Sequence, residues 1–221
     1  MIKIIMSGVI AVAIPLLLPQ IVQAQGTMTY LSSLNQASTG SPSVGSDSWL
    51  AALFITGINT DGYSLDSIQL GMADASGNPR GFTAMLYSAI LGSGVTPGSS
   101  LGTLDGSLDP AAGGIFTYTP AASITLLPHT AYFIVLTAGT PVANGAYSWS
   151  ESAYPPTINF WSVGNGVFYS RSGTSPWTTT PYLGIAQFAI NATAVPEPSI
   201  LGLFGLGGLA FLWHRRKSKA A

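Results

Sequence analysis

Apolar and polar residues alternate with a period near two along Tyr63–Met72, YSLDSIQLGM, which is the pattern of a β-strand. His129–Thr137 is the most apolar of the similar segments, and no segment of the body has the 3.6-residue period of a helix. We therefore predict an all-β fold of about ten short strands, arranged as a two-sheet β-sandwich or jelly roll. The segments predicted as strands are Met28–Leu34, Trp49–Thr56, Tyr63–Met72, Gly81–Ser88, Ile115–Thr119, Ser123–Leu127, His129–Thr137, Ala146–Glu151, Ile158–Val163, Val167–Arg171 and Leu183–Asn191.

Turn-forming residues separate these segments. Asp61-Gly62 and Asn144-Gly145 favour tight turns, because Gly, Asn and Asp tolerate the backbone angles that such turns need. Asp74–Pro79 is predicted to be a further turn. Ile90–Gly114, rich in Gly, Pro and Asp, is the longest predicted irregular region, and loops of that length commonly carry function or cover a surface.

Met1–Ala24 has the organisation of a secretory signal peptide. Lys3 supplies the positive start, Ile4–Leu18 the apolar core, and Val22-Gln23-Ala24 a cleavage site with small residues. The alternative is a retained N-terminal membrane helix, which the two prolines that break the apolar run disfavour. We expect export by the secretory pathway.

Val195–Ala221 has three parts in a fixed order. Val195-Pro196-Glu197-Pro198 is a stiff break, because each proline fixes φ. Ile200–Trp213 follows as an apolar run without charge. Four of the seven basic residues of the chain close the sequence: Arg215, Arg216, Lys217 and Lys219.

This order predicts a C-terminal membrane-anchoring helix, with the basic cluster as a membrane stop on the cytoplasmic side. A complete span takes roughly 20 residues, so the 14-residue run is short, and a core helix of the globular body is the alternative. The terminal position and the basic cluster favour the membrane, because a core helix rarely ends a chain in charges.

The same features resemble the PEP-CTERM sorting signal of Gram-negative bacteria over about the last 27 residues. The resemblance implies recognition by exosortase, a membrane-embedded, cysteine transpeptidase-like enzyme, while the chain is held in the inner membrane. It also implies a final place at the cell surface or in an extracellular matrix of exopolysaccharide, biofilm or floc. The predicted domains are then Met1–Ala24, the β-domain Gln25–Ala194 and the sorting signal Val195–Ala221.

The body resembles the choice-of-anchor R domain over roughly Trp49–Ile190. That family consists of exported bacterial modules with alternative surface anchors. It has no settled activity, so the resemblance implies no catalytic or binding residue. The segments that carry it are Phe54–Thr56, Leu65–Ile68, Leu86–Ser88, Pro97–Ser99, Phe116–Thr119, Thr130–Val135 and Tyr147–Trp149.

Charge and cysteine content exclude several classes of function. The predicted body has two basic side chains, Arg80 and Arg171, against seven acidic ones, which gives it a net charge of −5. Such a surface cannot bind a phosphate backbone electrostatically, so nucleic acid is excluded as a partner. The chain has no cysteine, which excludes thiol catalysis, thiolate metal sites and disulfides.

The acidic residues offer weak candidates for catalysis. Asp105 with Asp109, or Asp61 with Asp66, are the pairs available to a glycosidase, but they stand beside turn-forming residues and fit turns better. His129 is the one histidine of the body and accompanies no Gly-x-Ser-x-Gly motif. An oxygen-ligand Ca²⁺ site stays open as an alternative, although no DxDxDG-like loop occurs. We expect no cofactor and no metal.

Aromatic residues are the better candidates for binding, because their flat faces stack on sugars. We expect Trp49 and Trp149 to belong to the core, since both lie in predicted strands. Trp177 and Tyr154 lie in predicted loops, so we expect them to be exposed and name them as candidate glycan-binding residues. The other aromatic residues considered are Trp161, Tyr87, Tyr169 and Tyr182.

Two interpretations follow. The first is a non-enzymatic structural or glycan-binding module of the cell surface or matrix. The second is a carbohydrate-active enzyme, similar to a glycoside hydrolase, with its carboxylates in Ile90–Gly114. Because cations are few, a neutral or weakly charged polysaccharide is the expected ligand of the first.

Processing at Pro196-Glu197-Pro198 predicts a mature protein without the apolar run and the basic cluster. Intact-mass measurement on protein recovered from the cell surface tests this. The expected mass is that of a chain ending near the Pro-Glu-Pro sequence. Surface material that still ends at Ala221 would show that the motif is not a processing site.

Overall fold

The computed structural model describes residues 26–92, 94–153, 157–158, 160–164, 166–174, 176–180 and 184–196. Every regular element among them is a β-strand except one 3₁₀ turn, η1 (Val142–Asn144), so the predicted all-β class is confirmed. The predicted signal peptide and membrane-anchoring helix lie outside these residues. Within the described ranges, no helix is long and apolar enough to cross a membrane.

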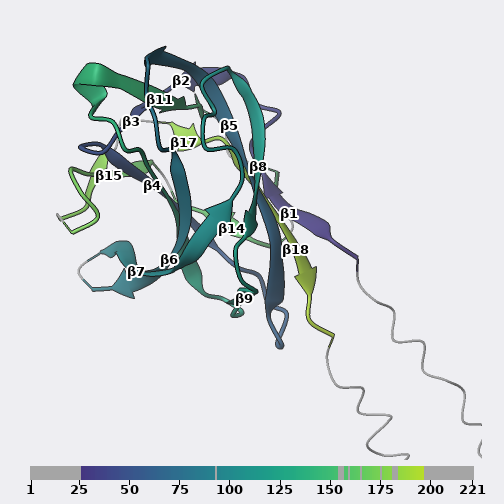
Figure 1. Cartoon of the computed structure of the whole chain (residues 1–221). Helices are drawn as coiled ribbons and strands as arrows, with labels where there is room; N and C mark the ends of the chain where they lie inside the picture. The colour runs from purple at the N-terminus through teal and green to yellow at the C-terminus, as the bar shows by residue number, and fades with distance from the viewer. Residues whose placement is uncertain are drawn as a thin grey trace, which may run out of the picture.

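Fifteen of the eighteen strands form one large antiparallel sheet (Figure 1). Its main path runs in the order β13 (Thr157–Ile158), β1 (Met28–Ser32), β18 (Phe188–Ala194), β5 (Tyr63–Gly77), β8 (Gly114–Pro120), β7 (Val95–Asp105), β6 (Thr83–Leu91), β10 (Ala131–Thr137), β4 (Trp49–Ile55), β15 (Val167–Ser170) and β16 (Thr178–Thr180).

Seven short or branching strands complete or extend this arrangement. β11 (Gly145–Trp149) pairs with β3 (Ser43–Val44) and β5, β14 (Ser162–Val163) pairs with β4, and β9 (Thr125–Leu126) pairs with β5. A separate three-stranded sheet has the order β17 (Ile185–Ala186), β12 (Glu151–Ser152) and β2 (Ser38–Gly40).

The large sheet has two halves that face each other across the core. The halves meet where β7 pairs with β8, at Leu104↔Pro120 and Asp105↔Thr119. Phe54 of β4 and Phe188 of β18 come from opposite halves, and their ring centroids are 6.5 Å apart. The two predicted sheets are therefore connected as one network of ladders. The jelly-roll topology stays a prediction.

Aromatic rings form much of the core between the halves. The Trp161 indole stacks on Tyr30 with centroids 5.0 Å apart and on Phe54 at 5.8 Å, while Tyr63 meets it edge-on at 5.0 Å. Offset stacks and edge-to-face pairs are the geometries that the ring quadrupole favours. Trp149 is fully buried, and its indole N–H donates to the Gln187 carbonyl at 3.0 Å.

Trp149 is therefore a core residue, as predicted from its strand. Trp49 is half-buried, and its indole N–H donates to the Ser46 carbonyl at 3.1 Å, so it contributes to packing without being enclosed. The predicted core position is therefore confirmed for Trp149 and only in part for Trp49.

The prediction that Ile90–Gly114 is irregular is wrong over most of its length. β6 continues to Leu91 and β7 begins at Val95, so the two strands form a hairpin, and residues 106–113 are the longest stretch of the region that the structure describes as irregular. The ladder is shifted near Ser88, whose hydroxyl accepts from the Ser99 N–H at 3.1 Å and donates to the Ser99 carbonyl at 3.3 Å. The Ser88 side chain thus replaces backbone hydrogen bonds of the β6–β7 ladder. The Gly and Ser residues of β7 also obscure the alternation of apolar and polar residues by which a strand is predicted. In the same way, β5 runs on to Gly77, into the turn predicted at Asp74–Pro79.

Glu151, on the small sheet, is a buried carboxyl group that the sequence did not indicate. Its side chain is 2% exposed, and one oxygen, Oε2, accepts from the Gly184 N–H at 3.2 Å. The other oxygen, Oε1, is buried and has no hydrogen-bond partner among the described residues. Burial raises the pKa of Glu151 to about 7, and the Gly184 N–H offsets part of this effect.

We predict that Glu151→Gln removes a pH-dependent loss of stability. Because the pKa of Glu151 is higher in the folded chain than in the unfolded one, the unfolded chain releases this proton first as the pH rises from about 4.5 to about 7. The free energy of unfolding of the parent therefore falls through that window and is level above it. Urea unfolding at pH 4 and at pH 8 tests this: the variant should match the parent at pH 4 and exceed it by about 3 kcal/mol at pH 8. Equal differences at both pH values would contradict the prediction.

Candidate functional site

The half of the sheet that contains β4, β6, β10 and β15 is apolar on its outer face as well as on its inner face. Along β10, Tyr132, Ile134 and Leu136 join the main core, whereas Phe133 and Val135 point to the opposite face and are also fully buried. Alternate residues of a strand lie on opposite faces, so these two sets belong to different layers. The outer layer, which we call the outer cluster, consists of Ala51, Met85, Phe133, Val135 and Phe168.

Partly buried side chains cover the outer cluster. Phe133 and Phe168 form its centre, edge-to-face with centroids 4.9 Å apart. β16 pairs with β15 at Phe168↔Thr179, and this pairing places Trp177, which directly precedes β16, against the cluster. The full set of covering residues is Trp49, Leu53, Tyr87, Ala89, Val95 and Trp177.

Trp177 is half-buried rather than fully exposed. The sequence predicted a loop residue with no packing role, but one face of this indole rests on apolar neighbours. A half-buried ring is held in a fixed orientation while part of its surface stays accessible. This is a better arrangement for binding than a freely rotating side chain, because less conformational entropy is lost when a ligand binds.

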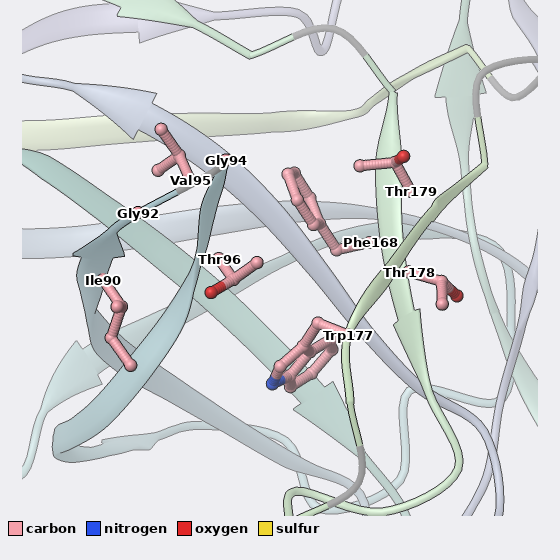
Figure 2. A pocket seen from close by; sticks show the side chains of 9 residues that line it. All are labelled: Ile90, Gly92, Gly94, Val95, Thr96, Phe168, Trp177, Thr178 and Thr179. Carbon is pink, nitrogen blue, oxygen red and sulfur yellow. The ribbon is translucent and has the colours of Figure 1, made fainter.

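A groove of about 670 Å³ opens beside Trp177 (Figure 2). The β6–β7 hairpin forms one side of it and the β15–β16 pair forms the other. We call it the Trp177 groove. Its lining residues are Ile90, Gly92, Gly94, Val95 and Thr96 on the hairpin side and Phe168, Trp177, Thr178 and Thr179 on the other.

The chemistry of the Trp177 groove is apolar and hydroxylic. None of the described residues that line it is titratable, so these residues supply no acid, base or nucleophilic carboxylate. It presents the rings of Trp177 and Phe168 together with threonine hydroxyls, one of which, Thr178 Oγ1, donates to the Tyr169 carbonyl at 3.4 Å. Such a surface can stack on an apolar face and hydrogen-bond to hydroxyl groups at its edge.

The predicted carboxylate pairs serve the fold. Asp109 accepts from the Tyr147 hydroxyl at 3.0 Å, and Asp66 accepts from the Thr193 hydroxyl at 2.7 Å. Burial and the hydrogen bond to Asp109 raise the pKa of Tyr147 to about 12, so the phenol stays a donor. Of the other members of the pairs, Asp105 ends β7 and Asp61 lies in a turn, and both are exposed. One carboxylate of each pair is therefore already a structural acceptor.

Neither His129 nor the Ca²⁺ site considered above acquires further candidate ligands or catalytic partners among the described residues. His129 is exposed just before β10, and its backbone N–H donates to the Gly57 carbonyl at 2.9 Å. Among the described residues, no three His, Cys, Asp or Glu side chains are grouped so as to hold a metal ion. The Ca²⁺ alternative thus has no cluster to support it in that part of the chain.

The predicted sorting motif is described only at its start. The backbone N–H of Val195 donates to the Gly62 carbonyl at 3.0 Å, and the Val195 carbonyl accepts from Asn59 Nδ2 at 3.1 Å. Pro196, which follows, is exposed. The other predicted site residues lie outside the described residues: Glu197, Pro198, Arg215, Arg216, Lys217, Lys219 and the candidate glycan-binding Tyr154.

Comparison with protein families gives a match to the PEP-CTERM protein-sorting motif at residues 194–217. The predicted sorting signal is thereby confirmed: the chain carries a motif that marks exported proteins for sorting to the cell surface by exosortase. Neither the curated proteins nor the solved structures contain a match to the chain. The matched residues do not include the body, so its resemblance to the choice-of-anchor R domain stays a prediction.

The packing predicts different costs for removing two tryptophans. Trp149→Ala should lower the free energy of unfolding by about 3–5 kcal/mol, because a fully buried side chain leaves a cavity. Trp177→Ala should lower it by only about 1–2 kcal/mol, because part of the indole already contacts water. Urea unfolding of both variants checks this. Equal losses would mean that Trp177 is a core residue.

Proposed function

We propose that the mature protein is a non-enzymatic module of the cell surface or extracellular matrix, which binds a neutral polysaccharide in the Trp177 groove. The observation that carries the proposal is the half-buried Trp177 indole beside an uncharged groove bordered by threonine hydroxyls. The sorting motif explains how the module reaches the surface, and the groove supplies a reason for it to stay in a polysaccharide matrix.

The physical fit is between flat rings and the faces of sugars. A pyranose ring has C–H groups on its faces and hydroxyl groups around its edge, so an indole can contact the face while threonine hydroxyls contact the edge. Trp177 provides the accessible ring, the largely buried Phe168 lines the groove beside it, and Thr96 and Thr179 lie at the border of the same groove (Figure 2). Because the body has two cations and seven acidic groups, a strongly acidic polymer would be repelled.

Tyr154 belongs to the proposal on sequence grounds alone. It stands in a Pro-rich segment, as predicted for an exposed ring, and we propose that it supplies a second stacking contact. The β-sandwich or jelly-roll architecture and the association with exopolysaccharide or biofilm are also parts of this proposal. They are in keeping with a sorting motif whose carriers are exported.

A glycoside hydrolase that uses Asp105 and Asp109 has less support. Asp109 already accepts a hydrogen bond from Tyr147, and the region around Asp105 is a strand rather than a long loop. Among the described residues that line the Trp177 groove, none carries a carboxylate. A scaffold that binds sugar without cleaving it requires none.

Retention on the native exopolysaccharide tests the proposal. Mature protein with Trp177→Ala should bind about tenfold more weakly, the loss expected when one stacking contact of about 1.4 kcal/mol is removed. Trp177→Phe should keep most of the affinity, because it keeps an aromatic face. A double variant with Tyr154→Ala should weaken binding further, and affinity electrophoresis through neutral and acidic polysaccharides measures each case.

Two controls separate binding from folding and from catalysis. Leu108→Ala removes another exposed apolar side chain and should leave retention unchanged, while thermal unfolding confirms that each variant is folded. Asp105→Asn with Asp109→Asn should also leave retention unchanged, with no sugar released by any variant. Unaltered retention of a folded Trp177→Ala variant would refute the groove as the binding site.

A further inference from the structure

Three large apolar side chains project into solvent at one end of the body. Ile58 is 63% exposed, Leu127 is 58% exposed and Phe160 is 87% exposed. They come from three separate segments: the β4–β5 turn, the end of β9 and the segment before β14. We call them the apolar tip.

Contacts around Gly57 hold the three segments together. The Gly57 carbonyl accepts from the His129 N–H at 2.9 Å, which brings the segment after Leu127 to the turn that carries Ile58. On its other side, a side chain at Gly57 would come within 3.2 Å of the Phe160 carbonyl. A Cβ here would be tightly packed, so the segments that carry Ile58 and Phe160 lie in close contact at Gly57.

The backbone of the apolar tip is strained at Phe160, whose aromatic ring is exposed. Phe160 and His129 are the non-glycine residues with positive φ in the described ranges, at 62° and 47°. Such conformations cost free energy and persist where the surrounding structure enforces them, commonly at functional sites. The next residue, Trp161, is buried with its indole stacked on Tyr30, whereas the Phe160 side chain is exposed.

The chain leaves the body at the same end. Asn59 Nδ2 donates to the Gly62 carbonyl at 2.6 Å and to the Val195 carbonyl at 3.1 Å, while the Val195 N–H donates to Gly62 at 3.0 Å. The residues that bind Val195 thus belong to the turn that carries Ile58. In Figure 1, the end of β18 lies beside the start of β1 at this end of the body, in agreement with the Met28↔Ala192 pairing.

The short connection to the apolar run limits how far the tip can be from a membrane. Five backbone steps separate Val195 from Ile200, and they span at most about 18 Å when fully extended. The polar layer of a bilayer is itself about 6 Å thick on each side. While the apolar run is in the bilayer, the tip is therefore held at or near the membrane surface.

Charge does not account for an approach of this end to lipid. The cations of the described body are Arg80 and Arg171. The Arg80 carbonyl accepts from Gly139, just beyond the end of β10 opposite to the tip, and Arg171 follows Ser170, which pairs with Trp49 at the far end of β4. Asp61 and His129 stand in the segments of the tip, and the Tyr63 and Tyr132 hydroxyls accept from the Asn59 N–H at 3.2 Å and the Leu127 N–H at 2.9 Å, so none of these groups adds a cation except a protonated His129. Contact with lipid must then come from apolar side chains.

We propose that the apolar tip inserts into the membrane interface while the sorting signal is in the bilayer, and thereby presents Pro196-Glu197-Pro198 to exosortase at the membrane surface. The occupant is the lipid interface itself, and not exosortase or a second copy of the chain. This inference uses the sorting motif and goes beyond the proposed function, since it does not depend on the Trp177 groove.

The absence of native cysteine allows a direct test on the full chain. Ile58→Cys and Leu127→Cys variants, labelled with an environment-sensitive fluorophore, are reconstituted in phosphatidylcholine vesicles. Leu108→Cys and Ile115→Cys are matched controls, being exposed apolar positions away from the tip, at 74% and 57% exposure. Tip labels should be quenched by nitroxide lipids and protected from aqueous iodide, with little dependence on salt, and control labels should show the reverse.

The proposal is overturned if tip labels are as accessible to iodide as the controls. It is also overturned if their protection rises with protein density in the vesicles, which indicates a second copy, or requires added exosortase. In cells, Phe160→Ser should slow conversion to the tail-free species by about fivefold, whereas Leu108→Ser should not. Conversion at the parent rate by a folded Phe160→Ser variant would remove the proposed role in sorting, and thermal unfolding establishes that it is folded.

Discussion

The organisation of the body follows from two strands that are apolar on both faces. β4 and β10 pair side by side, and neither can leave a face in water without exposing a continuous apolar surface. The opposite half of the sheet covers their inner face, with Phe188 meeting Phe54. Their outer face is covered by the β6–β7 hairpin and by the segment around Trp177. The Trp177 groove lies between these two covering segments, because they are separate elements of the chain.

The strongest strands of this structure were evident from the sequence, and the weakest were not. Trp49–Thr56 and His129–Thr137 are so rich in apolar residues that their strands were predicted almost to the residue. β7 was missed because its ladder contains a shift at Ser88 and its sequence consists largely of Gly, Ser, Thr and Pro. Local pattern cannot show pairing that a partner strand imposes.

The candidate sites show the same division. Trp177 was named as an aromatic residue in a predicted loop, but its packing against the outer cluster depends on the pairing of β16 with β15, which the sequence does not display. Glu151 is the last residue of a predicted strand, and its burial arises from a small sheet of three segments remote in sequence. The sorting motif was recognisable because it consists of consecutive residues. The Trp177 groove, the buried Glu151 and the apolar tip depend on tertiary contacts between segments that are distant in the sequence.

The place of β18 in the sheet gives the order of events during export a physical consequence. β18 lies between β1 and β5, so the first and last strands of the body are neighbours, and without the last one both partners are left with unpaired edges. Translocation from the N-terminus delivers β18 only when nearly the whole body has crossed. The last ladders of the sheet therefore depend on residues that directly precede the sorting motif. A body in which β18 is not yet paired cannot hold Val195 against the Gly62 turn, so the hydrogen bonds at this junction require the last strand of the sheet to be in place.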